Sequence, residues 1–241
     1  MSKVIRVILF MILFQQSLAF SGSVSFGEES IFKRFQPTMI EVKVDENLHW
    51  DYDNKIARQK AESIYNYIHQ KYNAEKRYAA IYSCPGRADL FVTVSAPINT
   101  EENYGDRFFL IKEGDQGFSL LSKTHGMMDS YFLRPTFFTA TNRTIILGET
   151  GAEYSWGVVA FEIVNDKLKD LGTIYVAKPT EEDTVNPIPD AQLKLSSGKL
   201  IVEFHTDLVF EPGGHNDRLV KRVNNEPISF EYDGKKFLLI N

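Results

Sequence analysis

The sequence predicts a mainly β protein: three four-stranded antiparallel meander units, with an N-terminal strand and one amphipathic helix packed against them. Three observations predict this fold. A single stretch of chain shows a sustained 3.6-residue hydrophobic period. Six tight-turn signals each separate two β-rich runs, as hairpins do. The first, third and fifth of these turns, at Gly86, Asn142 and Ser197, lie 56 (142 − 86) and 55 (197 − 142) residues apart, which indicates a repeat.

The first nineteen residues have the layout of a secretory signal peptide. Lys3 and Arg6 give a positive start, an apolar run continues to Phe14, and Ser17-Leu18-Ala19 places small residues at the −3 and −1 positions of a cleavage site. The apolar run is about half of the roughly 20 residues that a membrane-spanning helix needs. We therefore expect a signal peptide over residues 1–19 and a periplasmic or secreted mature chain. No later stretch is apolar for long enough to predict a transmembrane segment.

Residues 20–76 are expected to supply a strand and a helix that pack on the β domain. The apolar residues between Met39 and Val44 predict the strand. From Asn54 to Tyr72 apolar side chains follow the helical period, and most of the other face is charged or polar. Asp53 is the expected N-cap of this helix. The apolar positions are Ile56, Ala57, Ala61, Ile64, Tyr65, Ile68 and Tyr72.

Residues 77–241 are expected to form one repeat-built β domain with four strands in each unit. The strands expected, unit by unit, are Tyr78–Cys84, Asp89–Ala96, Arg107–Lys112 and Gly117–Lys123; Thr136–Thr141, Thr144–Glu149, Ser155–Val164 and Lys167–Val176; and Ala191–Leu195, Lys199–Phe210, Pro227–Tyr232 and Lys235–Ile240. Successive units of this size are typical of propeller blades. Closed propellers generally have at least four blades, so a propeller-like arrangement, a bent sheet and a sandwich all stay open.

In an antiparallel meander, connections alternate between the two ends of the strands. The tight turns therefore fall at one end, and the long connections fall at the other. Binding groups concentrate on loops that a rigid scaffold holds, although long surface loops are also tolerated as plain insertions. We expect the binding surface at the loop-bearing end. Its long connections are Pro97–Asp106, Thr124–Arg134, Thr150–Trp156, Lys178–Asp190 and Glu211–Glu226.

One candidate site lies around the strand of the third unit. Glu203, His205 and Asp207 alternate along the chain, so they share one face of a strand. His215 in the next loop could complete a set of imidazole and carboxylate ligands for a divalent metal. Glu211 and Asp217 lie in the same loop and join the candidate binding residues. The same alternation is typical of any half-exposed strand, and no cofactor other than such a metal ion is expected.

A second candidate lies in the second unit, where Glu149 and Glu153 stand near Trp156. Paired acids beside an aromatic ring are typical of sugar binding or glycoside hydrolysis. Exposed acids near a hairpin, with the tryptophan packed inward, explain the pattern equally well. Cys84 ends an apolar strand beside a turn, where a lone cysteine usually packs as a small buried residue.

The net charge and the cysteine content limit the partners and cross-links that the chain is expected to have. Removal of residues 1–19 takes away two cations and no acid, so the net charge of the mature chain is 25 − 32, or −7. An acidic surface disfavours nucleic acid as a partner, and the single cysteine cannot form an intrachain disulfide. We expect an exported binding protein that holds a protein or a glycan at its loop end. The alternative is a hydrolase, possibly metal-assisted, that acts on envelope or extracellular polymer.

Overall fold

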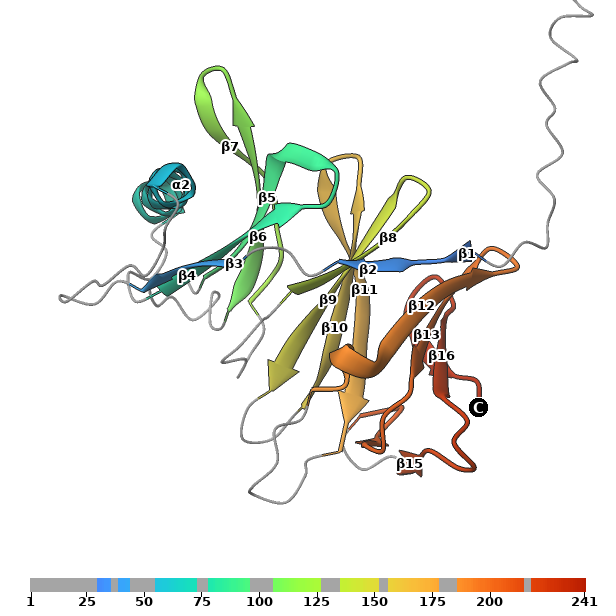
Figure 1. Ribbon diagram of the computed structural model, residues 1–241. Helices are drawn as coiled ribbons and strands as arrows, with labels where there is room; N and C mark the ends of the chain where they lie inside the picture. The colour runs from blue at the N-terminus through green and yellow to red at the C-terminus, as the bar shows by residue number, and fades with distance from the viewer. Residues whose placement is uncertain are drawn as a thin grey trace, which may run out of the picture.

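The computed structural model describes residues 30–35, 39–43, 55–72, 78–95, 106–126, 135–151, 156–177, 186–214 and 218–241. These residues form three antiparallel β-sheets and one α-helix, α2, so the mainly β prediction is confirmed (Figure 1). The expected signal peptide lies outside the described residues. Within them, no helix is both long and apolar enough to span a bilayer.

Each expected unit is the main part of one sheet. The strands of the first sheet, in spatial order, are β3 (Met39–Lys43), β4 (Tyr78–Cys84), β5 (Arg87–Ser95), β6 (Arg107–Gly114) and β7 (Gly117–Lys123). Those of the second are β15 (Val220–Lys221), β14 (Val209–Phe210), β11 (Lys167–Val176), β10 (Trp156–Val164), β9 (Arg143–Gly151), β8 (Pro135–Ala140) and β2 (Lys33–Phe35). Those of the third are β1 (Ser30–Ile31), β12 (Ala191–Ser196), β13 (Lys199–Phe204), β16 (Ile228–Tyr232) and β17 (Phe237–Leu239).

The third unit differs from its predicted form. One strand was expected over Lys199–Phe210, but β13 ends at Phe204 and the chain then leaves the third sheet. Val209 and Phe210 form β14, which pairs with the second sheet through Val176. Between the two strands the chain bends at Thr206 and Asp207, where Leu208 N–H donates to Thr206 Oγ1 over 3.4 Å.

The N-terminal segment adds one short strand to each sheet. β1 pairs with β12, β2 pairs with β8, and β3 pairs with β4, so in every case the added strand joins the first strand of a meander. Only β3 was predicted from the sequence. Between β1 and β2, Phe32 is buried in the core, and its N–H donates to Leu193 O over 2.9 Å. The segment therefore connects the edges of three successive sheets.

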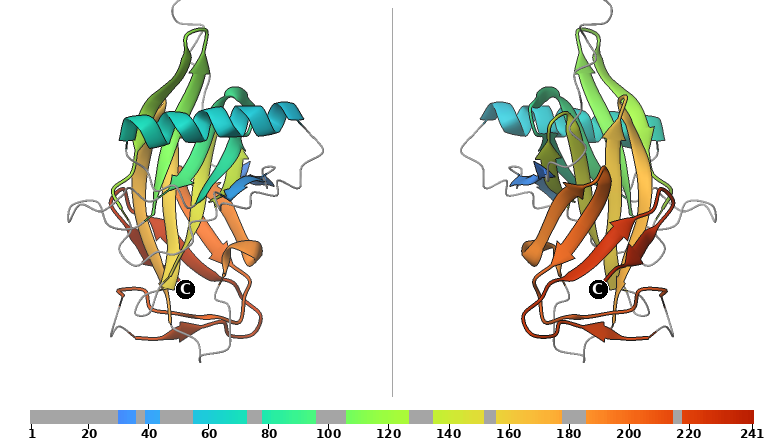
Figure 2. Two further views of the ribbon diagram at one scale, coloured as in Figure 1. Left: turned by 90° about the vertical axis from the view of Figure 1, so that its left-hand side faces the viewer. Right: turned by 90° about the vertical axis from the view of Figure 1, so that its right-hand side faces the viewer.

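The helix and the three sheets stack as four layers (Figures 1 and 2). Helix α2 (Lys55–Tyr72) covers the outer face of the first sheet, where Ile64 and Ile68 pack against Phe91 and Phe109. The inner face of the first sheet shares a second core with the second sheet. The opposite face of the second sheet shares the largest core with the third sheet. The second sheet is thus buried on both faces, which explains the unbroken apolar run Val158-Val159-Ala160-Phe161 in β10.

The tight turns lie at one end of the stack, as the meander order predicts. Figure 1 shows the β6–β7, β8–β9 and β10–β11 turns at the upper end of the molecule. Asn165 and Asp166 both have positive φ, 50° and 58°, which is the conformation of a two-residue type I′ hairpin turn. Asn142 likewise has a φ of 66°. Short polar side chains at these positions satisfy the turn geometry with little strain.

Candidate functional site

The structure describes only part of the loop-bearing end. Of the five long connections, it covers Asp106, residues 124–126, 150–151, 156, 186–190, 211–214 and 218–226. Three predicted site residues, Glu153, His215 and Asp217, lie outside the described residues. The other predicted site residues are described, and their contacts show whether they come together. They are Glu149, Trp156, Glu203, His205, Asp207 and Glu211.

The residues proposed as metal ligands do not form a cluster on their own. Glu203 lies on β13, where its Oε1 is 2.9 Å from Lys194 Nζ. His205 follows the strand and donates its backbone N–H to Asp190 O over 3.0 Å, while Asp207 is exposed in the bend. Among the described residues, no three His, Cys, Asp or Glu side chains are placed to share a metal ion. Because His215 is not among them, the four-residue metal site, and the hydrolase that would use it, stay predictions.

The second candidate pair is also only partly described. Glu149 Oε2 accepts a hydrogen bond from Asn186 Nδ2 over 3.2 Å. Trp156 is half-buried and packs against the core between the second and third sheets. This contact with the core is the inward packing that the alternative interpretation expected. Glu211 is half-buried beside β14, with its N–H bonded to Tyr175 O over 3.1 Å.

The clearest surface at the loop end is a groove beside β15, the outermost strand of the second sheet. Its volume is about 320 Å³. We call it the β15 groove. It is lined by Arg218, Leu219, Val220, Lys221, Arg222, Val223, Glu226, Pro227, Ile228 and Asn241. None of these residues was among the predicted site residues, although all but the last three fall in the predicted loop Glu211–Glu226.

The β15 groove is lined by three cations, one carboxylate (Glu226) and exposed apolar side chains. Within the described part of the chain, no carboxylate forms an ion pair with Arg218, Lys221 or Arg222. Leu219 and Val223, on either side of β15, are 57% and 62% exposed. Such apolar exposure beside uncompensated charge is typical of a surface that binds a partner.

Arg222 is held in place rather than free. Its Nη1 donates to His205 O over 3.0 Å and its Nη2 donates to Asn225 O over 2.7 Å. Both acceptors are neutral carbonyls, and no described carboxylate forms an ion pair with this guanidinium. The predicted residue His205 thus contributes to the groove through its backbone, by positioning Arg222.

A larger pocket, of about 570 Å³, opens at the opposite end, between the tight turns of the first and second sheets. We call it the turn-end pocket. It is lined by Cys84, Pro85, Gly86, Arg87, Leu90, Thr139, Asn142, Arg143, Thr144, Ile163, Asn165 and Asp166. The sequence did not predict this pocket. Turn residues indicate where each turn lies along the chain, but they do not indicate which turns of different sheets become neighbours.

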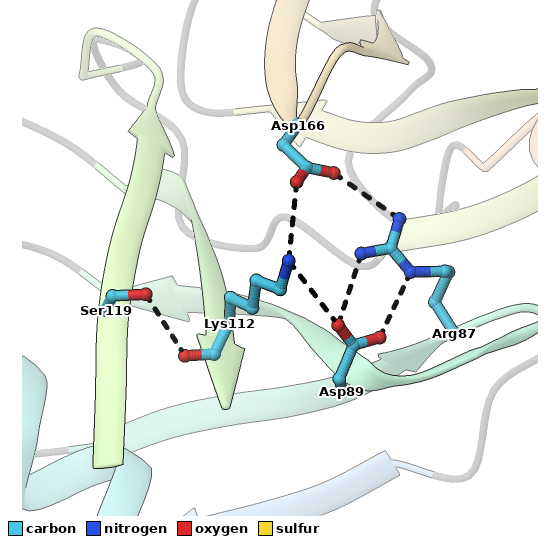
Figure 3. A network of polar contacts seen from close by, with 5 residues as sticks. All are labelled: Arg87, Asp89, Lys112, Ser119 and Asp166. Carbon is cyan, nitrogen blue, oxygen red and sulfur yellow. Dashed lines mark hydrogen bonds and ion pairs between the residues drawn. The ribbon is translucent and has the colours of Figure 1, made fainter. Parts of the chain in front are cut away.

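An ion-pair network joins the two sheets beside this pocket (Figure 3). Arg87 Nε and Nη2 donate to the two carboxylate oxygens of Asp89 over 3.0 and 3.2 Å, and its Nη1 reaches Asp166 Oδ1 at 3.4 Å. Lys112 Nζ lies 3.8 Å from each of the two carboxylates. The bidentate contact raises the pKa of Arg87 and lowers the pKa of Asp89 from their ordinary values. The network therefore carries its charges at neutral pH.

The thiol of Cys84 is expected to be unreactive in the folded protein. Burial raises its pKa to about 12, from 9.0, so the reactive thiolate fraction is about a thousandfold lower than for a free thiol. We expect a disulfide reagent at pH 8 to label the native protein at least about a hundredfold more slowly than the guanidinium-unfolded protein, in which the same thiol is accessible. Since Cys84 is the only cysteine, the chromophore released reports this site alone. Equal rates in the two states would show that the β4–β5 hairpin is open.

Comparison with known proteins assigns no family to this chain. No family model matches the sequence, no curated protein matches it, and no solved structure matches its fold. The function is therefore argued from the chemistry of the two sites.

Proposed function

We propose that the chain is an exported binding protein whose loop-bearing end holds an acidic, partly apolar segment of a protein partner. The observation that supports it is the β15 groove, where three cations lack ion-pair partners among the described residues and two large apolar side chains are exposed. The export signal expected over residues 1–19 would deliver this surface to the periplasm or the outside.

Charge favours an acidic partner segment at this place. The chain as a whole has a net charge of −5, so most of its surface repels an anion. Arg218 and Lys221 are exposed, and together with Arg222 they outnumber Glu226, the one carboxylate side chain of the lining, so the region is positive. An acidic segment would thus be steered to the groove and rejected elsewhere, which supplies specificity as well as attraction.

The apolar side chains favour a polypeptide. Leu219 and Val223 present methyl groups to solvent at the two ends of β15, where side chains of an extended segment would meet them. β15 is also an edge strand, and its outer side is the place where an added strand could pair with its backbone. Burial of the two side chains would add roughly 1–2 kcal/mol each, at about 25 cal/mol per Å² of apolar surface.

The scaffold in this proposal is an open series of blade-like sheets. Each consecutive pair of sheets shares one hydrophobic core, as neighbouring propeller blades do. The sheets keep separate hydrogen-bond ladders among the described residues, so the likeness to a propeller lies in their stacking. A rigid stack of this kind would hold the loop end in a constant shape for its partner.

The test uses a fluorescein-labelled peptide of alternating glutamate and leucine, with a lysine–leucine peptide of the same length as its counterpart. We expect the full mature chain to bind the acidic peptide, measured by fluorescence anisotropy, and to bind it more weakly as salt is raised. The double variant Arg218→Glu/Lys221→Glu should weaken binding at least about tenfold, because it reverses two charges at the contact.

The matched control is Lys235→Glu/Lys236→Glu, which reverses two exposed lysines in the β16–β17 turn, outside the groove. It changes the net charge by the same amount and should leave binding within about twofold. Equal losses in the two double variants, or a preference for the lysine–leucine peptide, would overturn the proposal. Circular dichroism of each variant establishes that the fold is retained.

A further inference from the structure

We propose that the turn-end pocket is a binding site for a neutral saccharide. This site lies at the end opposite the β15 groove, and the inference does not rest on the function proposed for that groove. It follows from three properties of the pocket: its charged side chains are paired, its neutral polar side chains bond to no described residue, and part of its lining is apolar.

The charged side chains around the pocket neutralise one another. Arg87 and Lys112 are matched by Asp89 and Asp166 in the network of Figure 3. Arg143, on the opposite wall, has its Nε 2.6 Å from Glu162 Oε1. An anionic ligand would have to displace these carboxylates from the guanidinium groups, and a cationic ligand would have to displace the cations. A ligand without net charge meets neither obstacle.

Four neutral polar side chains of the lining have unused hydrogen-bonding groups. Thr139, Asn142, Thr144 and Asn165 make no side-chain hydrogen bond with any described residue. Thr139 and Thr144 are a cross-strand pair on β8 and β9, so their side chains lie side by side on one face. The two amides each offer a donor and an acceptor, and the two hydroxyls can do either. This set matches a ligand with several adjacent hydroxyl groups.

The deeper wall of the pocket is apolar. Ile163 of β10 pairs with Thr144 of β9. Its side chain therefore lies on the same face of the second sheet as those of Thr139 and Thr144. Leu90 and Pro85 contribute from the first sheet. A sugar ring has one polar rim of hydroxyls and an apolar face of C–H groups, so it can contact both kinds of wall at once. The volume lies within the roughly 300–1,000 Å³ that small-ligand sites occupy.

The geometry also explains the position of the pocket. It forms where the core between the first and second sheets ends, at the turns, and where the ion pair between Arg87 and Asp166 still joins the two sheets. The positive-φ residues Asn142 and Asn165 are at the tips of the β8–β9 and β10–β11 turns. Their backbones are fixed by the turn geometry, so the two side-chain amides extend from defined positions beside the pocket.

The test titrates the full mature chain with glucose, galactose, mannose, N-acetylglucosamine, maltose and cellobiose, and follows side-chain amide signals by nitrogen-15 NMR. We expect at least one neutral sugar to shift the amides of Asn142 and Asn165 in a saturable manner. Glucuronate, glucosamine and inorganic phosphate should cause no saturable shift at the same concentrations. The absence of saturation with every neutral sugar, or tighter binding of a charged probe, would overturn the inference.

Two variants test the polar side chains of the pocket while the backbone of its turns is kept. Asn142→Gly/Asn165→Gly removes both amides but keeps the backbone, because glycine adopts positive φ readily. We expect it to weaken the sugar roughly tenfold, which corresponds to losing about one to two net hydrogen bonds. Thr144→Val, which removes one hydroxyl without changing a turn, should weaken it about threefold. Binding in these variants is followed by saturation-transfer NMR on the sugar protons.

The matched control is Ser197→Gly, which makes the same kind of change at another positive-φ turn position, in the β12–β13 hairpin of the third sheet. It should leave the dissociation constant unchanged. Unchanged affinity in both pocket variants, or an equal loss in the control, would show that the sugar binds elsewhere and would overturn the assignment.

Discussion

Replacement of Phe204 by alanine is expected to destabilise the protein by about 3–5 kcal/mol. Phe204 is fully buried at the end of β13, and its ring centroid lies 4.9 Å from that of Phe210 and 6.0 Å from that of Phe230. Phe210 belongs to β14 of the second sheet, whereas the other two belong to the third. Truncation leaves a cavity between two layers that cannot collapse without moving a whole sheet. The loss is a large share of the roughly 5–15 kcal/mol that holds a domain folded.

Guanidinium unfolding, followed by far-ultraviolet circular dichroism and by tryptophan fluorescence, measures this loss. The matched control is Leu238→Ala, on β17 of the same sheet, where the side chain is 40% exposed and lies on the face away from the core. It should cost no more than about 0.5–1 kcal/mol, because little cavity is made. Similar losses for the two variants would contradict the packing of the third sheet on the second.

The second large effect is expected at Phe32, where truncation to alanine should cost about 3 kcal/mol. Phe32 is the buried anchor of the N-terminal segment: it packs in the core between the second and third sheets, while the strands on either side of it pair with β12 and β8. The expected value is at the lower end of the range for phenylalanine, because a terminal segment can relax more freely than a central strand. Loss of the anchor should also loosen β1 and β2 together.

The neighbouring residue provides the control. Ile31 is 69% exposed, so Ile31→Ala alters the same N-terminal segment without opening a cavity and should change stability by less than about 0.5 kcal/mol. Limited proteolysis of the native protein supplies a second readout, since cleavage around residues 30–35 should accelerate in the Phe32 variant alone. Equal proteolysis in the two variants would mean that the segment is not held through Phe32.

Much of the fold was predictable because local chemistry determines it. The helical period places the apolar face of α2 on the first sheet, and the observed helix begins one residue after the expected Asn54. The turn residues Asn142, Asn165 and Asp166 adopt the positive φ that hairpin turns require, so the strands around them fall where alternation and turn chemistry predict. These signals act within a few residues of one another, and no knowledge of distant contacts is needed.

The short strands were not predictable in the same way. β1, β2, β14 and β15 contain only two or three residues each, which is too few for any periodic pattern. Val209 and Phe210 resemble a continuation of β13, and only the pairing of Phe210 with Val176 of β11 shows that they belong to another sheet.

The candidate sites also differ in whether neighbouring residues in the sequence could indicate them. Sequence reasoning favoured acids and histidines at the loop end, whereas the groove that the structure describes there is lined by Arg218, Lys221 and Arg222. Three cations within five residues of an acidic chain, interspersed with Leu219 and Val220, were a signal that could have pointed to it. The turn-end pocket had no such signal, because one of its walls comes from the β4–β5 turn, which lies more than fifty residues before the β8–β9 and β10–β11 turns of the other wall.

By itself, the sequence determined the class of the fold, the order of its meanders, the amphipathic helix and the end at which each tight turn lies. Only the tertiary structure decided the stacking of the three sheets, the pairing of the N-terminal strands and the position of both pockets. The physical reason is the range of the interactions. Turn geometry and hydrophobic periodicity act between near neighbours in the chain, whereas a shared core such as that of Phe32, Phe204 and Phe210 exists only once distant segments have met.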